Sequence, residues 1–98
     1  MQQLTTKYDT PLSIALDYDE TFTAHKELWT QFVYLASTLG CKVTFVTYRQ
    51  EIRRAGNEDI LEDAKSLGIP VVFSNGTPKS SVFKADIWID DNPSTIAS

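Results

Sequence analysis

The chain of 98 residues is 42% hydrophobic and 22% charged, a composition typical of one globular domain spanning residues 1–98. Its formal net charge of −4 argues against sequence-independent binding to nucleic acid or anionic membranes, because both depend on clustered lysine and arginine. The longest strongly apolar run, 69–73, is far shorter than the ~20 residues of a membrane span, and a single cysteine, Cys41, fits a reducing compartment. We therefore expect a cytoplasmic protein with no membrane partner.

Strands and helices are predicted to alternate along the chain. Four short apolar runs predict strands at 12–16, 43–46, 69–73 and 87–89. A helix over 24–39 is predicted from apolar residues at helical spacing, namely Leu28, Phe32, Leu35 and Leu39. Asn57 is expected to cap a second helix, over 58–67, which Gly68 ends, and a short helix is expected around 79–83.

This alternation predicts an α/β fold, because parallel strands joined by helices pair through right-handed crossovers. We expect a three-layer, Rossmann-like sandwich around a four-stranded parallel sheet in the order 4-1-2-3. Polar residues follow three of the four strands: Asp17 and Asp19, then Thr47, then Asp90 and Asp91. Since the carboxyl edge of an open parallel sheet is where such folds bind ligands, these segments are expected to meet in one crevice.

The residue types at this edge favour phosphate chemistry assisted by magnesium. Four carboxylates placed close together repel one another unless a cation joins them, and an all-oxygen ligand set favours Mg²⁺ over Zn²⁺. An anionic substrate would bridge this metal and the cationic Lys79, while Thr47 would donate a hydrogen bond to its oxygens. One carboxylate could attack phosphorus, and another could protonate the leaving alkoxide and then deprotonate water, which is phosphomonoester hydrolysis through an aspartyl-phosphate.

Four short motifs resemble those of the haloacid dehalogenase (HAD) superfamily: Asp17-Tyr-Asp19-Glu-Thr21, Val46-Thr47, Lys79 and Ile89-Asp90-Asp91. The amino-acid sequences of these motifs are also similar to those of very small hydrolases of this superfamily from phage and bacterial genomes. The resemblance implies that Asp17 is the nucleophile and a metal ligand. It implies that Asp19 is the general acid/base and binds the metal through its backbone carbonyl. An acid at position 19 is the pattern of the phosphatase and phosphotransferase members, whereas the dehalogenases lack it.

The same resemblance implies roles for the later motifs. Thr47 and Lys79 would bind the phosphoryl group, Asp90 would complete the Mg²⁺ site, and Asp91 would be a ligand directly or through water. The implied activity is that of a magnesium-dependent phosphatase, a phosphoric monoester hydrolase.

Three features depart from the superfamily pattern. Glu20 stands where glycine is usual, so the turn after Asp19 must accept a residue with a Cβ atom or carry strain. The connections after Thr21 and Phe73 are too short for an inserted cap domain, so we expect a capless enzyme. A fifth strand is not expected, which makes the fourth strand an edge that a homo-oligomer could cover.

Several assignments stay open at this stage. Arg49 either binds the leaving group of the substrate or is solvated, and His25 either lines the site or lies on the surface. The alternative functions are a phosphotransferase with the same intermediate and a non-catalytic module that binds phosphate or a protein. The expected partner is a phosphorylated substrate, either a small molecule or a nucleic-acid end.

Overall fold

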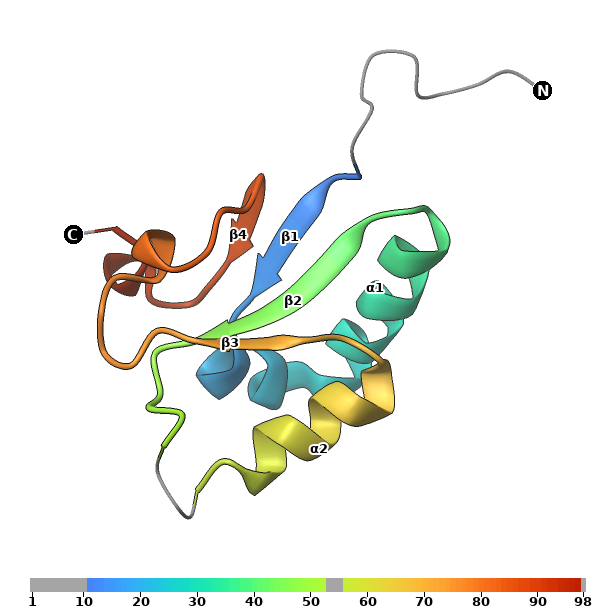
Figure 1. The fold of residues 1–98 in the computed structure, drawn as a ribbon. Coiled ribbons are helices and arrows are strands. Elements are labelled where there is room, and N and C mark those ends of the chain that lie inside the picture. The colour runs from blue at the N-terminus through green and yellow to red at the C-terminus, as the bar shows by residue number, and fades with distance from the viewer. Residues whose placement is uncertain (1–10, 53–55, 98) are drawn as a thin grey trace.

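The computed structural model describes residues 11–52 and 56–97, which contain a parallel sheet and two α-helices (Figure 1). The strands are β1 (Ser13–Leu16), β2 (Lys42–Thr47), β3 (Val71–Phe73) and β4 (Ile87–Ile89). The α-helices are α1 (Lys26–Thr38) and α2 (Glu58–Leu67). Short 3₁₀ turns span Thr23–His25, Lys79–Ser81 and Pro93–Thr95.

The four strands of the described ranges form one parallel sheet in the order β3-β2-β1-β4, which confirms the predicted order. In register, Leu16 of β1 pairs with Phe45 of β2 on one side and with Ile89 of β4 on the other. The carboxyl ends of these strands therefore lie along the same edge of the sheet. β4 is an outer strand, and Ile87 at its start is 41% exposed.

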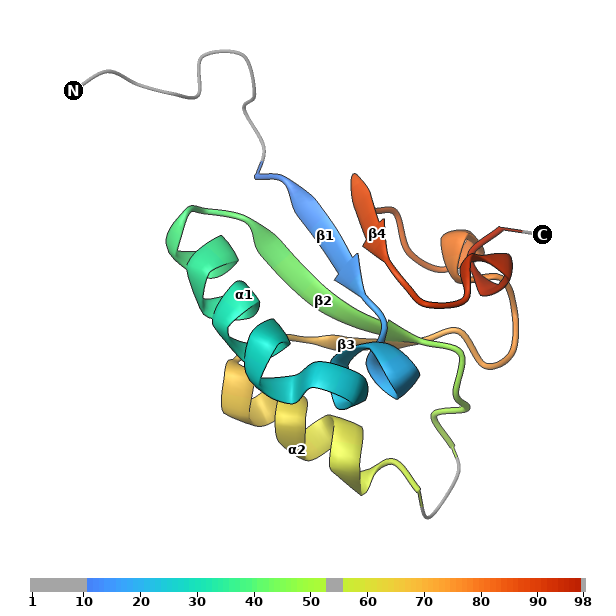
Figure 2. The ribbon, with the colours of Figure 1, turned by 180° about the vertical axis from the view of Figure 1, so that it is seen from behind.

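Both α-helices pack on one face of the sheet (Figures 1 and 2). Leu16 and Phe45 from the strands, Val33 from α1 and Ile60 from α2 are fully buried in the core between these layers. Burial of such side chains contributes roughly 1.5–3 kcal/mol each relative to leaving them exposed, so this face supplies most of the hydrophobic stabilisation.

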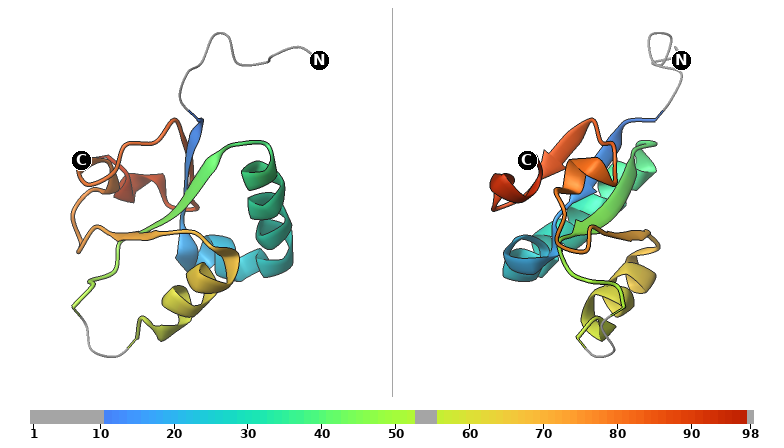
Figure 3. Two further views of the ribbon diagram at one scale, coloured as in Figure 1. Left: turned by 45° about the vertical axis from the view of Figure 1, so that its right-hand side comes forward. Right: turned by 60° about the vertical axis from the view of Figure 1, so that its left-hand side comes forward.

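The opposite face is covered more thinly, by the chain that connects β3 to β4 (Figure 3). Because β3 and β4 are the two outer strands, residues 74–86 must cross the whole sheet. The rings of Phe83 and of Trp88 in β4 pack edge to face, with 6.4 Å between their centroids. Where a short helix was predicted around 79–83, the chain makes only the 3₁₀ turn Lys79–Ser81.

The boundaries of the two α-helices follow the local sequence. α2 begins after Asn57 as predicted, and Gly68 ends it in the left-handed conformation at φ 72°. α1 begins two residues later than predicted, because residues 23–25 form a tighter 3₁₀ turn before it. No helix in the described ranges combines the length and the apolarity that crossing a membrane requires.

Candidate active site

The first part of the site is the turn that follows β1. The backbone N–H of Asp17 donates to the carbonyl of Ile89 at 2.9 Å, which continues the β1–β4 pairing by one residue. Asp19 (φ −68°, ψ 129°) and Glu20 (φ 66°, ψ −1°) then take the two central positions of a type II turn. The second central position requires positive φ and usually holds glycine, so Glu20 adopts a strained conformation there.

Lys79 links the carboxylates of Asp17 and Asp90 where β1 and β4 end. Its Nζ atom donates to Asp17 Oδ1 at 2.7 Å and to Asp90 Oδ2 at 2.6 Å. The Lys79 side chain is only 2% exposed, and those of Asp17 and Asp90 are nearly as buried. The contact between Lys79 and Asp17 joins residues 62 positions apart in the chain. Because all three side chains are buried away from water, each charge is stabilised by the opposite charge beside it.

Asp91 completes an acidic group with Asp17 and Asp90. One carboxylate oxygen from each residue lies within 4.8 Å of the others. The Thr21 hydroxyl oxygen lies 3.1 Å from Asp17 Oδ2 and 3.0 Å from Asp91 Oδ1, and it accepts the backbone N–H of Asp91 at 3.1 Å. Thr21 thus fixes the chain after β4 against the turn after β1.

Burial and the neighbouring charges shift the ionisation of this group. Burial raises the pKa of the Asp17 carboxyl to about 7, although the hydrogen bond and the charge of Lys79 oppose that change. A hydrogen bond with Asp17, together with one from Thr21, lowers the pKa of Asp91 below its ordinary value. The pKa values of these two neighbouring carboxyls are therefore shifted in opposite directions.

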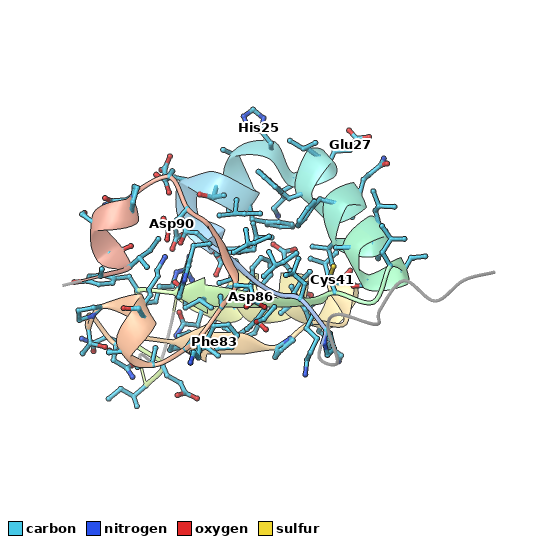
Figure 4. All side chains as sticks on the ribbon, turned by 90° about the horizontal axis from the view of Figure 1, so that it is seen from above. His25, Glu27, Cys41, Phe83, Asp86 and Asp90 are labelled. Atoms are coloured by element: carbon cyan, nitrogen blue, oxygen red, sulfur yellow. The ribbon has the colours of Figure 1, made fainter. Side chains whose placement is uncertain are left out.

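The acidic group fits a divalent cation. With all three carboxyls ionised, the charge of Lys79 leaves two negative charges uncompensated, the amount that one divalent cation neutralises. The ligands are all carboxylate oxygens, which suits Mg²⁺ or Ca²⁺ better than Zn²⁺. In Figure 4, Asp90 lies over the carboxyl edge of the sheet, whereas His25 points outward from the chain before α1.

Asp19 is not part of this acidic group, because its side chain pairs with Arg49. Arg49 Nη2 donates to Asp19 Oδ1 at 2.7 Å, and Arg49 Nε donates to Asp19 Oδ2 at 3.0 Å. The other edge of the guanidinium binds both carboxylate oxygens of Asp59, at 2.8 and 3.1 Å. Asp19 and Asp59 hold the pKa of Arg49 above its ordinary value, and Arg49 holds that of Asp59 below its own.

Thr47, predicted as a phosphoryl ligand, is buried at the end of β2. Its hydroxyl oxygen accepts the backbone N–H of Arg49 at 3.3 Å. Among the described residues no hydrogen bond connects it to the acidic group. Its backbone carbonyl accepts the N–H of Ser74 at 2.8 Å, and the Ser74 hydroxyl oxygen is buried without a protein partner in the described part of the chain.

Two contacts of the site were missed by sequence reasoning. Asp59, in the first turn of α2, binds Arg49, and the sequence carries no signal of this contact. Asn57 does precede α2, but its side chain makes no capping bond. Its amide nitrogen donates to the carbonyl of Gln50 at 2.9 Å, while its Oδ1 accepts from Arg49.

Comparison of the chain with models of protein families, with curated proteins and with solved structures gives no match. Any functional assignment therefore depends on the residues and the geometry described above.

Proposed function

We propose that this chain is a magnesium-dependent phosphomonoester hydrolase of the haloacid dehalogenase type, with a Rossmann-like sandwich as its fold. One observation carries the proposal. A buried aspartate at the end of the central strand β1 is paired with a buried lysine, and two further aspartates from the end of the neighbouring strand β4 lie beside it. A metal-assisted nucleophilic carboxylate needs this combination of residues.

In the first chemical step, a carboxylate oxygen of Asp17 attacks the phosphorus atom of the substrate. The bond between phosphorus and the ester oxygen breaks, and the leaving alkoxide takes a proton from the Asp19 carboxyl. Lys79, which contacts Asp17 directly, would bind a phosphoryl oxygen and offset the charge that builds up on it. The products are the aspartyl-phosphate and the free alcohol.

In the second step, Asp19 takes a proton from water as the water oxygen attacks the same phosphorus atom. The bond between phosphorus and the Asp17 oxygen breaks, which releases inorganic phosphate and restores the Asp17 carboxylate. Asp19 has then regained the proton that it donated, so the cycle closes without another reactant.

Asp17, Asp90 and Asp91 would hold the Mg²⁺ ion, and the Asp19 carbonyl is proposed as a further ligand. When bound, the ion would reduce the repulsion between the attacking carboxylate and the anionic phosphate. Thr21 would keep Asp17 and Asp91 in place for it through its hydroxyl contacts with both.

Access to this site is set by two short connections, residues 17–25 between β1 and α1 and residues 74–86 between β3 and β4. Neither is long enough to contain an inserted cap domain. An uncapped site leaves its carboxyl edge open to large substrates, so the proposal includes phosphorylated nucleic-acid ends as well as small phosphomonoesters.

The test is phosphate release from a panel of phosphomonoesters with added Mg²⁺, including p-nitrophenyl phosphate, a sugar phosphate, a nucleoside monophosphate and a 3′-phosphorylated oligonucleotide. We expect Asp17→Asn to abolish release, because an amide cannot form the acyl-phosphate. Glu62→Gln, which removes one exposed charge on α2, is the control and should keep full activity. Added alcohols show whether the phosphoryl group goes to water or to an acceptor. Release by Asp17→Asn at the normal rate, or no release by the wild type from any substrate, overturns the proposal.

A further inference from the structure

The guanidinium of Arg49 is enclosed on several sides by acceptors from three chain segments. Asp19 of the turn after β1 takes the Nε–Nη2 edge through two hydrogen bonds, and Asp59 of α2 takes the adjacent Nη1–Nη2 edge through two more. The carbonyl of Gly56 and the Oδ1 atom of Asn57 accept from Nη1. These bonds engage all three nitrogen atoms of the guanidinium.

An aromatic ring beneath the guanidinium fixes it further. The carbon at the centre of the guanidinium lies 5.3 Å from the centroid of the Tyr18 ring, within the range of a cation–π contact. Tyr18 is itself buried, packed against Phe22 and Phe45, and its hydroxyl donates to Asp63 Oδ2 at 2.6 Å. The Arg49 guanidinium therefore lies against a ring that belongs to the buried core.

Asp19, in contrast, has little else to hold its side chain. It is 50% exposed and lies next to the strained residue Glu20 in the turn. Within the described residues, Arg49 is the partner that the hydrogen-bond geometry gives to the Asp19 carboxylate. Without Arg49, this carboxylate would be free to move among its rotamers in solvent.

We propose that Arg49 is the positioning residue for Asp19, with Asp59 as the anchor that keeps Arg49 in place. This role rests on the proposed function, in which Asp19 is the general acid/base. It differs from both roles that the sequence left open for Arg49: the side chain is only 22% exposed and its donors are already engaged within the protein, so it is neither solvated nor free to bind substrate. General acid/base catalysis depends on placing the proton-carrying group within hydrogen-bond reach of the leaving oxygen, so a fixed Asp19 is worth more than a mobile one. To carry the proton, Asp19 gives up one of its two hydrogen bonds to Arg49 and is held by the other.

The test compares two substrates that differ in their need for a proton donor. An alkyl phosphate has a poor leaving group that needs protonation, whereas the leaving group of p-nitrophenyl phosphate scarcely does. Asp19→Asn should lower kcat for the alkyl ester by about 10²-fold or more, and much less for the nitrophenyl ester. Arg49→Gln should show the same selectivity with a smaller loss, about 10-fold on the alkyl ester, and Asp59→Asn a weaker form of it. Glu62→Gln removes one negative charge from α2, as Asp59→Asn does, and it should leave kcat unchanged for both esters.

Two outcomes overturn the proposal. Equal losses on both esters for Arg49→Gln would mean that Arg49 acts only on the fold, and a raised KM with unchanged kcat would make it a substrate ligand. The double variant Asp19→Asn with Arg49→Gln should be no more selective than Asp19→Asn alone, since Arg49 acts through Asp19.

A second measurement separates this proposal from the proposed function. If the wild-type chain hydrolyses no ester, the function fails, and the pairing is then tested by the unfolding free energies of the same two single variants and the double variant. Non-additive losses support the pairing of Asp19 and Arg49, and additive losses overturn it.

Discussion

Lys79 is a lysine with almost no exposed surface, and its ion-pair partners in the described part of the chain, Asp17 and Asp90, are nearly as buried as it is. Removing one partner of such a group leaves the others charged without a counterion. We expect Lys79→Ala to lower the free energy of unfolding at neutral pH by about 3–5 kcal/mol, measured by urea denaturation without divalent cations. Lys65→Ala, at an exposed site on α2, is the control and should change it by less than about 0.5 kcal/mol. Similar losses in the two variants would contradict the buried ion pairs.

The raised pKa of Asp17 predicts how stability depends on pH in the absence of metal. In the folded state this carboxyl keeps its proton up to pH about 7, whereas in the unfolded chain it loses the proton near its ordinary pKa of 3.8. Between these values the folded state binds more protons, so stability falls as pH rises, by at most about 1.4 kcal/mol per pH unit. Urea denaturation in EDTA from pH 4 to 8 should show this fall in the wild type, and Asp17→Asn should remove it. If the free energies of unfolding of the wild type and Asp17→Asn differ by the same amount at every pH, the raised pKa of Asp17 is contradicted.

At the scale of single residues, sequence reasoning grouped part of the site and missed another part. Five residues that follow predicted strands were expected to meet at one edge, with Lys79 beside them as the cation for an anionic substrate. Of these, Asp17, Asp90 and Asp91 do lie together with Lys79, and their catalytic roles stay predictions. Asp19 and Thr47 make no side-chain hydrogen bond to this group in the described part of the chain. The pairing of Asp19 with Arg49 was not foreseen, since it depends on where the turn after β1 points its side chains.

At the scale of elements, helix α1 shows why periodicity alone does not identify the buried face. Of the four apolar residues whose spacing predicted the helix, Phe32 packs against the core, whereas the other three are more than half exposed: Leu28, Leu35 and Leu39. The buried positions of the helix are Val33 and Ala36. Both sets are spaced as a helix requires, so the pattern predicts the helix but not its rotation. The packing of α1 on β2 and α2 decides between the two faces.

This rotation of α1 is testable with two substitutions on one helix. Val33 is fully buried and Leu35 is 60% exposed. Val33→Ala should lower the free energy of unfolding by about 2 kcal/mol, because two buried methyl groups are lost and a cavity remains. Leu35→Ala should cost about 0.5 kcal/mol or less. Thermal and urea unfolding of the two variants side by side provides the measurement, and a larger loss for Leu35→Ala would mean that α1 presents the other face to the sheet.

At the scale of the whole molecule, the alternation of strands and helices predicted the sheet order correctly, because right-handed crossovers leave few arrangements of four parallel strands. The amount of structure that covers each face of the sheet was harder to predict. Residues 74–86 cross the face opposite α1 and α2 and contain one 3₁₀ turn, Lys79–Ser81. The few residues after Pro78 show no helical periodicity, so the sequence did not predict how long a helix would form on this face.

Because the two faces of the sheet are covered so differently, the acidic site connects the weakly covered strand β4 to the central part of the fold. β4 has only three residues and pairs with β1 alone among the described strands. In the described ranges, the face of the sheet away from α1 and α2 is covered by the chain that connects β3 to β4, so few contacts hold β4. Lys79, Asp90 and Asp91 connect this weakly held region to Asp17 and Thr21 at the end of the central strand. A cation held by the three aspartates would strengthen that connection, since it binds the folded arrangement and not the unfolded chain.

We therefore expect Mg²⁺ to protect one part of the molecule selectively. In hydrogen–deuterium exchange, backbone amides of residues 79–97 and of the turn after β1 should exchange more slowly with Mg²⁺ than with K⁺ at equal ionic strength, whereas those of α2 should not change. Asp90→Asn should remove the difference while leaving the exchange of α2 as it is in the wild type. Protection spread evenly over both layers would instead indicate a general effect of the ion on the charged surface, and no protection at all would mean that the three aspartates do not hold Mg²⁺.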